Sequence, residues 1–255
     1  MPPAEAVTGA EAEPGFWRRI ELHPSPTVLI AGIEDDAHRF LIHLSLQDGI
    51  VAGVKVKGER IPYTTCADAG GFFKDSLVGL QLQEIANLDS HSHCTHIFDL
   101  AVLCARHASD TASTRFDLRV TDPAKGQKRA TLYENGKRVL RWEVTDTFIL
   151  GPGVFNDKDL RKFSLWKDEL SPAELEHASM LRRAVMVAGS RAIPINDATR
   201  PADRGQGRMG ACFTYQMPRV LQAERAAAEW RKDFSHSQGP LQNFTFETSH
   251  PGSET

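Results

Sequence analysis

Residues 40–56 have the sequence FLIHLSLQDGIVAGVKV, which predicts two antiparallel strands joined by a tight turn. Apolar and polar side chains alternate over Phe40–Leu46, as they do in a strand with one buried face. Asp48-Gly49 is a strong turn signal, because such turns need residues that tolerate a positive φ. The chain then continues into Ile50–Val56 as the second strand. This pattern predicts an antiparallel sheet.

More strand signals lie on both sides of this hairpin. Thr27–Ile33 is nearly all β-branched or apolar, and apolar residues alternate over 116–120. Residues 130–133 and 139–144 flank Glu134–Lys137, whose central Asn-Gly pair favours a two-residue hairpin loop. The second half of the chain is therefore also expected to contain antiparallel strands.

Four segments carry helix signals. The segment after residue 93 has an apolar stripe at helical spacing, and Ser92 is its predicted N-cap. A later helix opens on Ser171, which would cap its first turn, and Gly189 follows as a stop signal. The predicted helices are Ala67–Leu80, Cys94–Ala108, Ser171–Ala188 and Arg219–Lys232.

These elements predict an α/β (α+β) fold in which helices pack on one side of a mostly antiparallel sheet. Both halves show strands, a hairpin and then helices, an order that suggests duplication. The first residues lack the basic and apolar regions of a signal peptide, and both ends of the chain are expected to be disordered. The predicted divisions are a leader over 1–15, an α/β half with a cysteine–histidine cluster over 16–108, a second α/β half over 109–235 and a tail over 236–255.

Charge and composition argue against two classes of partner. The 255 residues have a formal net charge of −3 and no long basic run, whereas a surface that follows nucleic-acid phosphates needs clustered lysine and arginine. No apolar stretch approaches the roughly 18 residues that cross a bilayer. The four cysteines show no disulfide rhythm, which favours reduced thiols in a cytoplasmic, bacterial-type protein.

The segment 91–99, HSHCTHIFD, concentrates metal-binding groups. Imidazole, thiol and carboxylate are ligands of zinc and iron. If a helix begins near Cys94, His96 and Asp99 are neighbours on it, so that Asp99 would orient His96 or share a metal with it. The helix dipole would favour the thiolate of Cys94.

Two further segments carry the same donor types. Cys66 is predicted in a turn between a strand and a helix, where a thiolate is stabilised and exposed. The acidic run Glu34–Asp36 precedes His38 between two strands. Separate loops that each carry a donor are a common way to assemble one site. A purely structural role is the alternative: we expect Cys104 and Cys212 in the core, and an acidic turn is often simply solvated.

Several of these motifs resemble the bacterial family catalogued as domain of unknown function 2889. The resemblance covers most of residues 17–234 and implies no known activity. It rests on Arg60–Cys66, Leu77–Gly79 and Cys94–Ala101, with further pieces at Glu34–Phe40 and Gly210–Tyr215.

A more remote resemblance, over residues 27–108, is to the NifU/SufE-like fold of iron–sulfur scaffold proteins. In NifU-like proteins a cysteine after the third strand and a His-Cys pair at a helix start bind zinc or a cluster. By this resemblance Cys66, His93 and Cys94 would be ligands. Asp36 and His38 would lie near the scaffold's first ligand loop, which normally contributes a cysteine. Harder donors there favour a single zinc or iron ion over a cluster.

We therefore predict a metal- or thiolate-dependent enzyme that acts on a small organic molecule, with a zinc or iron ion that polarises a carbonyl or activates water. No nucleic acid or membrane partner is expected, and a homo-oligomer stays open. One alternative is a non-catalytic zinc, iron–sulfur or persulfide carrier. Another is a metal-free cysteine/histidine catalyst, in which Cys66 or Cys94 pairs with His96 or His93. The predicted metal ligands are Asp36, Cys66, His93 and Cys94, and the predicted catalytic residues are His96, Asp99 and His38.

Overall fold

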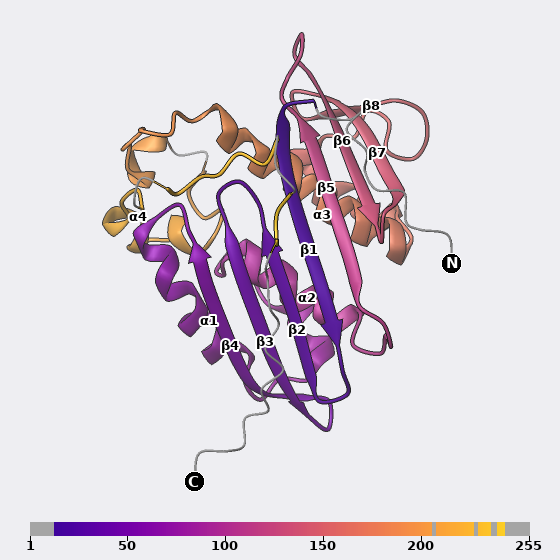
Figure 1. The fold of residues 1–255 in the computed structure, drawn as a ribbon, viewed down its shortest axis with the longest axis vertical. Helices are drawn as coiled ribbons and strands as arrows, with labels where there is room; N and C mark the ends of the chain where they lie inside the picture. Colours follow the sequence, from indigo (N-terminus) through magenta and orange to yellow (C-terminus); the bar gives the residue numbers. More distant parts are fainter. Residues whose placement is uncertain (1–12, 206–207, 227–228, 236–238, 243–255) are drawn as a thin grey trace.

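An eight-stranded antiparallel sheet joins the two halves of the chain (Figure 1). The structure is a computed structural model that describes residues 13–205, 208–226, 229–235 and 239–242. The strand order is β4-β3-β2-β1-β5-β6-β7-β8, so each half contributes four consecutive strands. The strands are β1 (Gly15–Pro24), β2 (Val28–Glu34), β3 (Arg39–Gln47), β4 (Ile50–Arg60), β5 (Thr114–Thr121), β6 (Gln127–Glu134), β7 (Lys137–Thr145) and β8 (Phe148–Leu150).

Both predicted hairpins are confirmed. Asp48 and Gly49 connect β3 to β4 with φ values of 51° and 78°. Asn135 and Gly136 connect β6 to β7 with φ values of 49° and 83°. Two successive residues with positive φ match the right-handed twist of the flanking strands, which is why these residue pairs are found there.

The central strand β1 is absent from the sequence-based expectations. It pairs with β2 on one side and β5 on the other, and it begins at Gly15, which was assigned to the leader. On the face toward the helices, Arg18 interrupts an apolar row between Phe16 and Ile20. That charge hides the alternating pattern by which a half-buried strand is recognised. Residues 1–12 lie outside the described residues.

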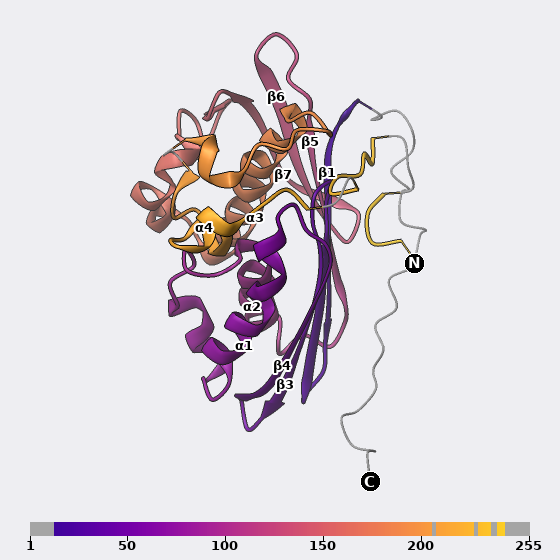
Figure 2. The same cartoon turned by 90° about the vertical axis from the view of Figure 1, so that its left-hand side faces the viewer.

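The helices pack on one face of the sheet (Figure 2), as predicted. Helix α2 contacts β1, β2 and β3, whereas helix α3 contacts β1, β5, β6 and β7, so each half of the sheet has its own covering helix. The side chain of Ser171 caps α3 and forms the predicted capping box with Glu174. The helices are α1 (Ala69–Leu77), α2 (Thr95–Arg106), α3 (Pro172–Ala188) and α4 (Arg219–Gln222).

Two helix predictions need correction. The last helix ends at Gln222 and not near Lys232, because the following residues pair with another segment: Thr64 N donates to the carbonyl of Glu224 at 3.0 Å, and Ala226 N donates to Pro62 at 3.1 Å. Tertiary pairing there overrides the local helical pattern. The N-cap of α2 is Cys94, since the hydroxyl of Ser92 is bonded to the carbonyl of Asp89.

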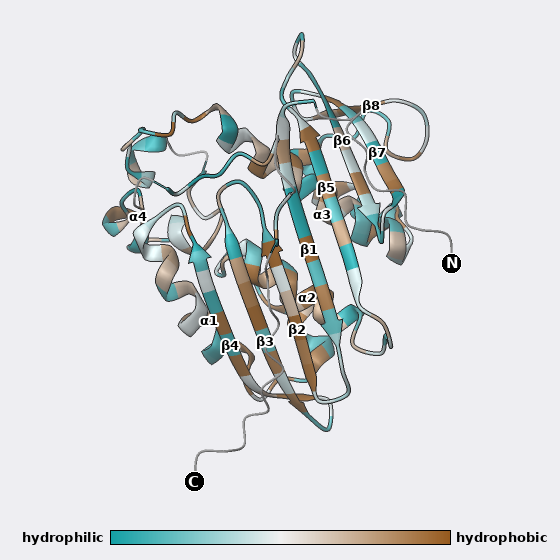
Figure 3. Ribbon diagram, viewed as in Figure 1, coloured by the Kyte–Doolittle hydropathy of each residue, from teal (hydrophilic) through white to brown (hydrophobic). Residues whose placement is uncertain are grey.

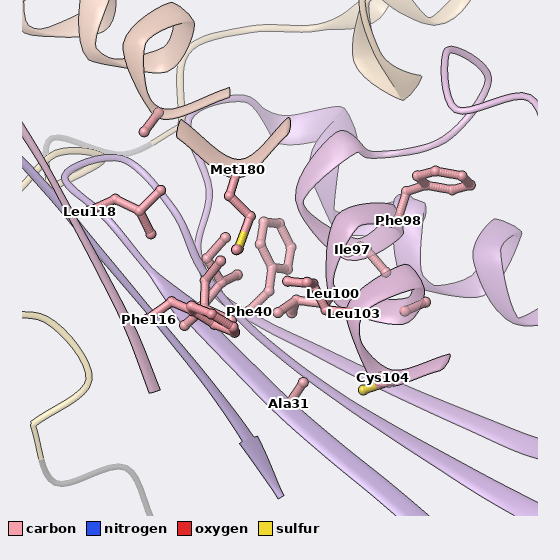
Figure 4. Close-up of a cluster of buried hydrophobic side chains, with 14 of the residues drawn as sticks. Ala31, Phe40, Ile97, Phe98, Leu100, Leu103, Cys104, Phe116, Leu118 and Met180 are labelled. Atoms are coloured by element: carbon pink, nitrogen blue, oxygen red, sulfur yellow. The ribbon is translucent and has the colours of Figure 1, made fainter. Parts of the chain in front are cut away.

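The main core lies between the sheet and the helices (Figure 4). Phe40 and Phe116 project from the sheet toward Leu100 of α2 and Met180 of α3. Cys104 is buried in this core, as predicted. Burying these apolar side chains supplies the main stabilisation that lets the core tolerate buried charge elsewhere.

A short C-terminal segment crosses the opposite face of the sheet. Arg19 donates to the carbonyl of Pro240 at 3.0 Å, and Leu241 N donates to Glu34 at 2.5 Å. A Cβ on Gly239 would lie 2.5 Å from the ring of Trp17, so only glycine fits there. Part of the predicted tail is thus bound to the sheet, while residues 236–238 and 243–255 lie outside the described residues. Over the described ranges, no helix has both the length and the apolar character needed to cross a membrane.

His107, at the C-terminus of α2, ties that helix to α3. Its Nδ1 lies 2.7 Å from a carboxylate oxygen of Asp110, and its Nε2 lies 3.2 Å from one of Glu176. Glu176 makes the largest contribution, and the two carboxylates together raise the pKa of His107 from 6.5 to about 9.

His107→Gln should therefore destabilise the protein in a pH-dependent way. The raised pKa means that folding favours the charged imidazole, a contribution that is complete below pH 6.5 and disappears as the pH rises through about 9. Because the site is partly solvated, we expect a loss of about 1–2 kcal/mol in slightly acidic buffer and almost none in strongly alkaline buffer. Urea unfolding at the two pH values measures this, with the exposed His91→Gln as control. Equal losses at both pH values would contradict the assignment.

Candidate functional site

A buried polar cluster lies where β1, the turn between β2 and β3, and the first turn of α2 meet. It consists of Arg18, Asp35, His38 and His96, and we call it the histidine–aspartate cluster. The carboxylate of Asp35 accepts from the backbone N–H groups of Ala37 and His38, both at 2.9 Å, which closes the turn and fixes the carboxylate. The sheet and helix together leave Asp35 fully buried.

The charges in this cluster are paired. Arg18 Nη2 lies 2.5 Å from Asp35 Oδ2 and 2.9 Å from His96 Nε2, and His38 Nδ1 lies 3.0 Å from Asp35 Oδ1. Burial alone would raise the pKa of Asp35, but His38 and Arg18 outweigh it and hold that pKa well below its usual value. Burial, with His38 and Arg18, lowers the pKa of His96 well below its usual value. Asp35 is therefore charged, and neutral His96 accepts from Arg18.

The two imidazole rings stack face to face, with their centroids 3.7 Å apart. Asp35, His38 and His96 each offer a ligand atom within 4.8 Å of the other two, the spacing of a candidate metal site. Two features oppose a metal in this arrangement. Arg18 already occupies the ligand atoms of Asp35 and His96. An imidazole lone pair lies in the plane of its ring, so two stacked rings do not direct their lone pairs at one ion. Hydrogen bonds and the ion pair with Arg18 therefore already use the atoms that would bind a metal.

A second group contains three of the four cysteines, Cys66, Cys94 and Cys212, which we call the thiol cluster. Cys66 lies in a 3₁₀ helix at Thr64–Asp68, and Cys94 caps α2. Cys94 interacts electrostatically with both Cys66 and Cys212. The convergence of Cys66 and Cys94 on one site stays a prediction. Cys212, expected in the core, is only partly buried and belongs to this cluster. Burial raises the pKa of Cys66 to about 11 and also raises that of Cys94.

The predicted single site separates into these two clusters. Over the described residues, neither thiol has a hydrogen bond or ion pair with the side chain of Asp36, His38 or His96. Asp35, and not Asp36, faces the histidines. The carboxylate of Asp36 lies 2.5 Å from Arg191 in a network with Asp122 and Asp233, and burial raises its pKa to about 6. The prediction that Asp36 joins the thiols is therefore wrong, because neighbouring turn residues point in different directions.

Asp99 differs from its predicted role, whereas the ligand role of His93 stays a prediction. The carboxylate of Asp99 receives two hydrogen bonds from Arg183 of α3, at 2.9 and 3.3 Å, so it does not orient His96. Helical spacing places Asp99 and His96 at neighbouring positions on α2, but His96 faces the sheet and Asp99 faces α3. His93 is buried among the rings of Phe72, Phe73 and Phe98, and burial lowers its pKa.

Sequence reasoning missed Arg18 and undervalued Asp35. Figure 3 shows hydrophilic segments on β1, although this strand has sheet neighbours on both sides. A signal was available: Arg18 stands two residues from Phe16 and two from Ile20, so it shares their buried face. An arginine in an apolar row requires a buried acceptor, which Asp35 supplies.

No protein-family model matches the chain, and no curated protein matches it. The resemblances to the domain of unknown function 2889 and to the NifU/SufE-like fold stay predictions.

Arg18→Met should be one of the most destabilising single substitutions in this protein. It leaves the charged carboxylate of Asp35 fully buried without its cation, for which we expect a loss of about 3–5 kcal/mol of unfolding free energy. Adding Asp35→Asn should recover part of that loss, since the uncompensated charge is gone.

Arg115→Met is the matched control on the neighbouring strand. Arg115 pairs with Asp117 at 3.1 Å but is 43% exposed, so its removal should cost less than about 1 kcal/mol. Denaturant unfolding compares the variants. The account of the cluster fails if Arg18→Met costs no more than Arg115→Met.

Proposed function

We propose that this chain is an enzyme that performs acid–base chemistry on a small organic molecule, with His38 as the proton-transfer group and Asp35 as its partner. The contact between His38 Nδ1 and Asp35 Oδ1, at 3.0 Å, carries the proposal. A buried carboxylate that holds an imidazole in one tautomer is a recurrent element of general acid–base catalysis.

The members of the cluster differ in their access to solvent. The side chain of His38 is 13% exposed, whereas those of His96 and Asp35 are 6% and 0% exposed. In the part of the chain that the structure describes, His38 Nε2 has no hydrogen-bond partner. Of the two imidazoles in the cluster, that of His38 is therefore the more accessible to a substrate. This asymmetry supports His38 as the group that exchanges protons with a substrate.

Each of the other side chains has a defined role in this scheme. With its proton on Nδ1 donated to Asp35, neutral His38 presents a lone pair on Nε2 that removes a proton from the substrate. Asp35 stabilises the imidazolium that results. Arg18 balances the permanent charge of Asp35, and the stacked ring of His96 holds the plane of His38. Arg18 and His96 act as positioning residues.

A metal-dependent version of this enzyme is the second candidate. The 4.8 Å grouping of Asp35, His38 and His96 favours it. It requires that the guanidinium of Arg18 leave His96 Nε2 and that His38 Nδ1 lose the proton that it shares with Asp35. Only then are these atoms free to bind a metal ion. The metal would then polarise a carbonyl or activate water. A thiolate nucleophile has less support, since burial raises the thiol pKa values and no imidazole is bonded to a thiol among the described residues.

His38→Gln should abolish turnover. We expect the parent chain to act on at least one member of a panel of p-nitrophenyl esters and enolisable ketones, and the variant to lose a factor of about 10²–10⁴ in rate. His91→Gln, at an exposed loop position, should retain the parent rate. Chelation with EDTA should leave the rate unchanged.

Two results would count against the metal-free enzyme. A His38→Gln variant as active as the parent, or a parent without turnover on every probe, contradicts the role of His38. Loss of activity on chelation that added zinc or iron restores would transfer the proposal to the metal-dependent version.

A further inference from the structure

The C-terminal part of the chain holds the turn between β2 and β3 from outside. Lys232 N donates to the carbonyl of Asp36 at 2.7 Å, and Leu241 N donates to the carboxylate of Glu34 at 2.5 Å. These two acceptors flank Asp35, which carries the carboxylate of the histidine–aspartate cluster. Backbone N–H groups near the C-terminus therefore contact both neighbours of that residue.

These contacts come from residues 229–235 and 239–242, which we call the C-terminal clasp. Two side chains fasten the first of these segments to the rest of the molecule. Arg231 donates to three backbone carbonyls just after α3, at 2.7, 3.0 and 3.2 Å. The hydroxyl of Ser235 accepts from Gly15 N of β1 at 3.1 Å. The clasp thus connects the end of α3, the central strand and the turn.

The second segment fits closely on the face of the sheet opposite the helices. A Cβ on Gly239 would meet the ring of Trp17 at 2.5 Å, and Arg19 donates to the carbonyl of Pro240 at 3.0 Å. Leu241 is buried although its φ is 58°, a value that is strained for a bulky side chain. Such strain persists only where the surrounding contacts hold it in place. These residues therefore occupy a specific site and do not merely lie on the surface.

Two arginines link the clasp to the turn. Arg60 donates to the carboxylate of Glu34 at 2.9 Å and to the carbonyl of Asp35 at 2.5 Å. Arg191 donates to the carboxylate of Asp36 at 2.5 Å and to the clasp at 3.4 Å. The turn itself closes with internal hydrogen bonds, so the groups that hold it from outside set its position over β1 and α2.

We propose that the C-terminal clasp positions the turn for catalysis, with Glu34 and Asp36 as its two points of attachment. This role rests on the proposed function of His38. The hydrogen bond between His38 Nδ1 and Asp35 is 3.0 Å long, and a displacement of about 1 Å in a catalytic group can cost about 10²-fold in rate. Glu34 and Asp36 act on the imidazole through the turn, and they are positioning residues.

Gly239→Ala tests the clasp in the full-length chain. The added Cβ meets the ring of Trp17, so Leu241 N should lose its contact with the carboxylate that accepts it. The amide of Leu241 should then exchange its hydrogen faster by a factor of about 10 or more, because overpacking a tight contact is costly. Gly126→Ala is the matched control: Gly126 also has a positive φ, of 79°, but a Cβ there meets nothing within 4 Å.

The decisive readout is at His38. In Gly239→Ala the imidazole ¹⁵N chemical shifts of His38 should change, since its hydrogen bond to Asp35 is disturbed, whereas those of His107 should keep their parent values. Turnover of the p-nitrophenyl ester or enolisable ketone on which the parent acts should fall by about 10-fold or more. Gly126→Ala should match the parent in both measurements. A clasp that only adds stability would leave the His38 shifts unchanged in the folded variant.

A measurement on the parent chain avoids variants that fail to fold. The amides of Ala37 and His38 donate to the carboxylate of Asp35 within the turn. If the clasp holds the turn, these hydrogen bonds open whenever the contact of Leu241 with the sheet opens. Hydrogen–deuterium exchange followed by NMR should therefore find both amides no better protected than that of Leu241.

Three outcomes would overturn the role of the clasp. One is a Gly239→Ala chain whose Leu241 amide exchanges as slowly as in the parent. Another is a variant in which that amide exchanges faster while the His38 shifts stay the same. The third is a parent in which the amides of Ala37 and His38 are protected about 10-fold better than that of Leu241, or more. A parent without turnover would contradict the proposed enzyme, whereas the exchange and ¹⁵N measurements would still decide whether the clasp positions His38.

Discussion

The ion pair between Arg18 and Asp35 is the constraint on which the rest of the structure depends. Both side chains are buried, and neither charge is tolerable there without the other. The pair joins the central strand to the turn between β2 and β3, and its guanidinium continues to His96 on α2. Because the apolar core packs closely around this pair, a small error in its geometry would leave buried charges without partners.

The N-terminus of α2 connects the two clusters. His96 enters the histidine–aspartate cluster on the side of the sheet, whereas Cys94, two residues earlier, lies on the side of residues 212–214. Residues two apart on a helix point in nearly opposite directions, which explains why one short motif serves two places. The proposed acid–base chemistry therefore belongs to the side of this helix start that faces the sheet, and not to the thiols.

The sequence predicted local features better than long-range ones. The turns at Asp48-Gly49 and Asn135-Gly136 were predictable because positive φ restricts the choice of residue, and α3 was predictable from its capping box. Strand β1 was not, because a buried arginine breaks its pattern, and its acceptor lies in a turn that only the folded sheet brings near. The donor types in the site were recognised, but Asp36 was chosen over Asp35, since spacing does not say which way a turn residue points.

The central claim is that protons, and not a metal ion, complete the histidine–aspartate cluster. The imidazole ¹⁵N chemical shifts of His38 and His96 at neutral pH test it most directly, because they distinguish protonated from bare ring nitrogens. The account predicts a proton on Nδ1 of His38 and a bare Nε2 on His96 that accepts from Arg18. A bare Nδ1 on His38, or a protonated Nε2 on His96, would contradict it.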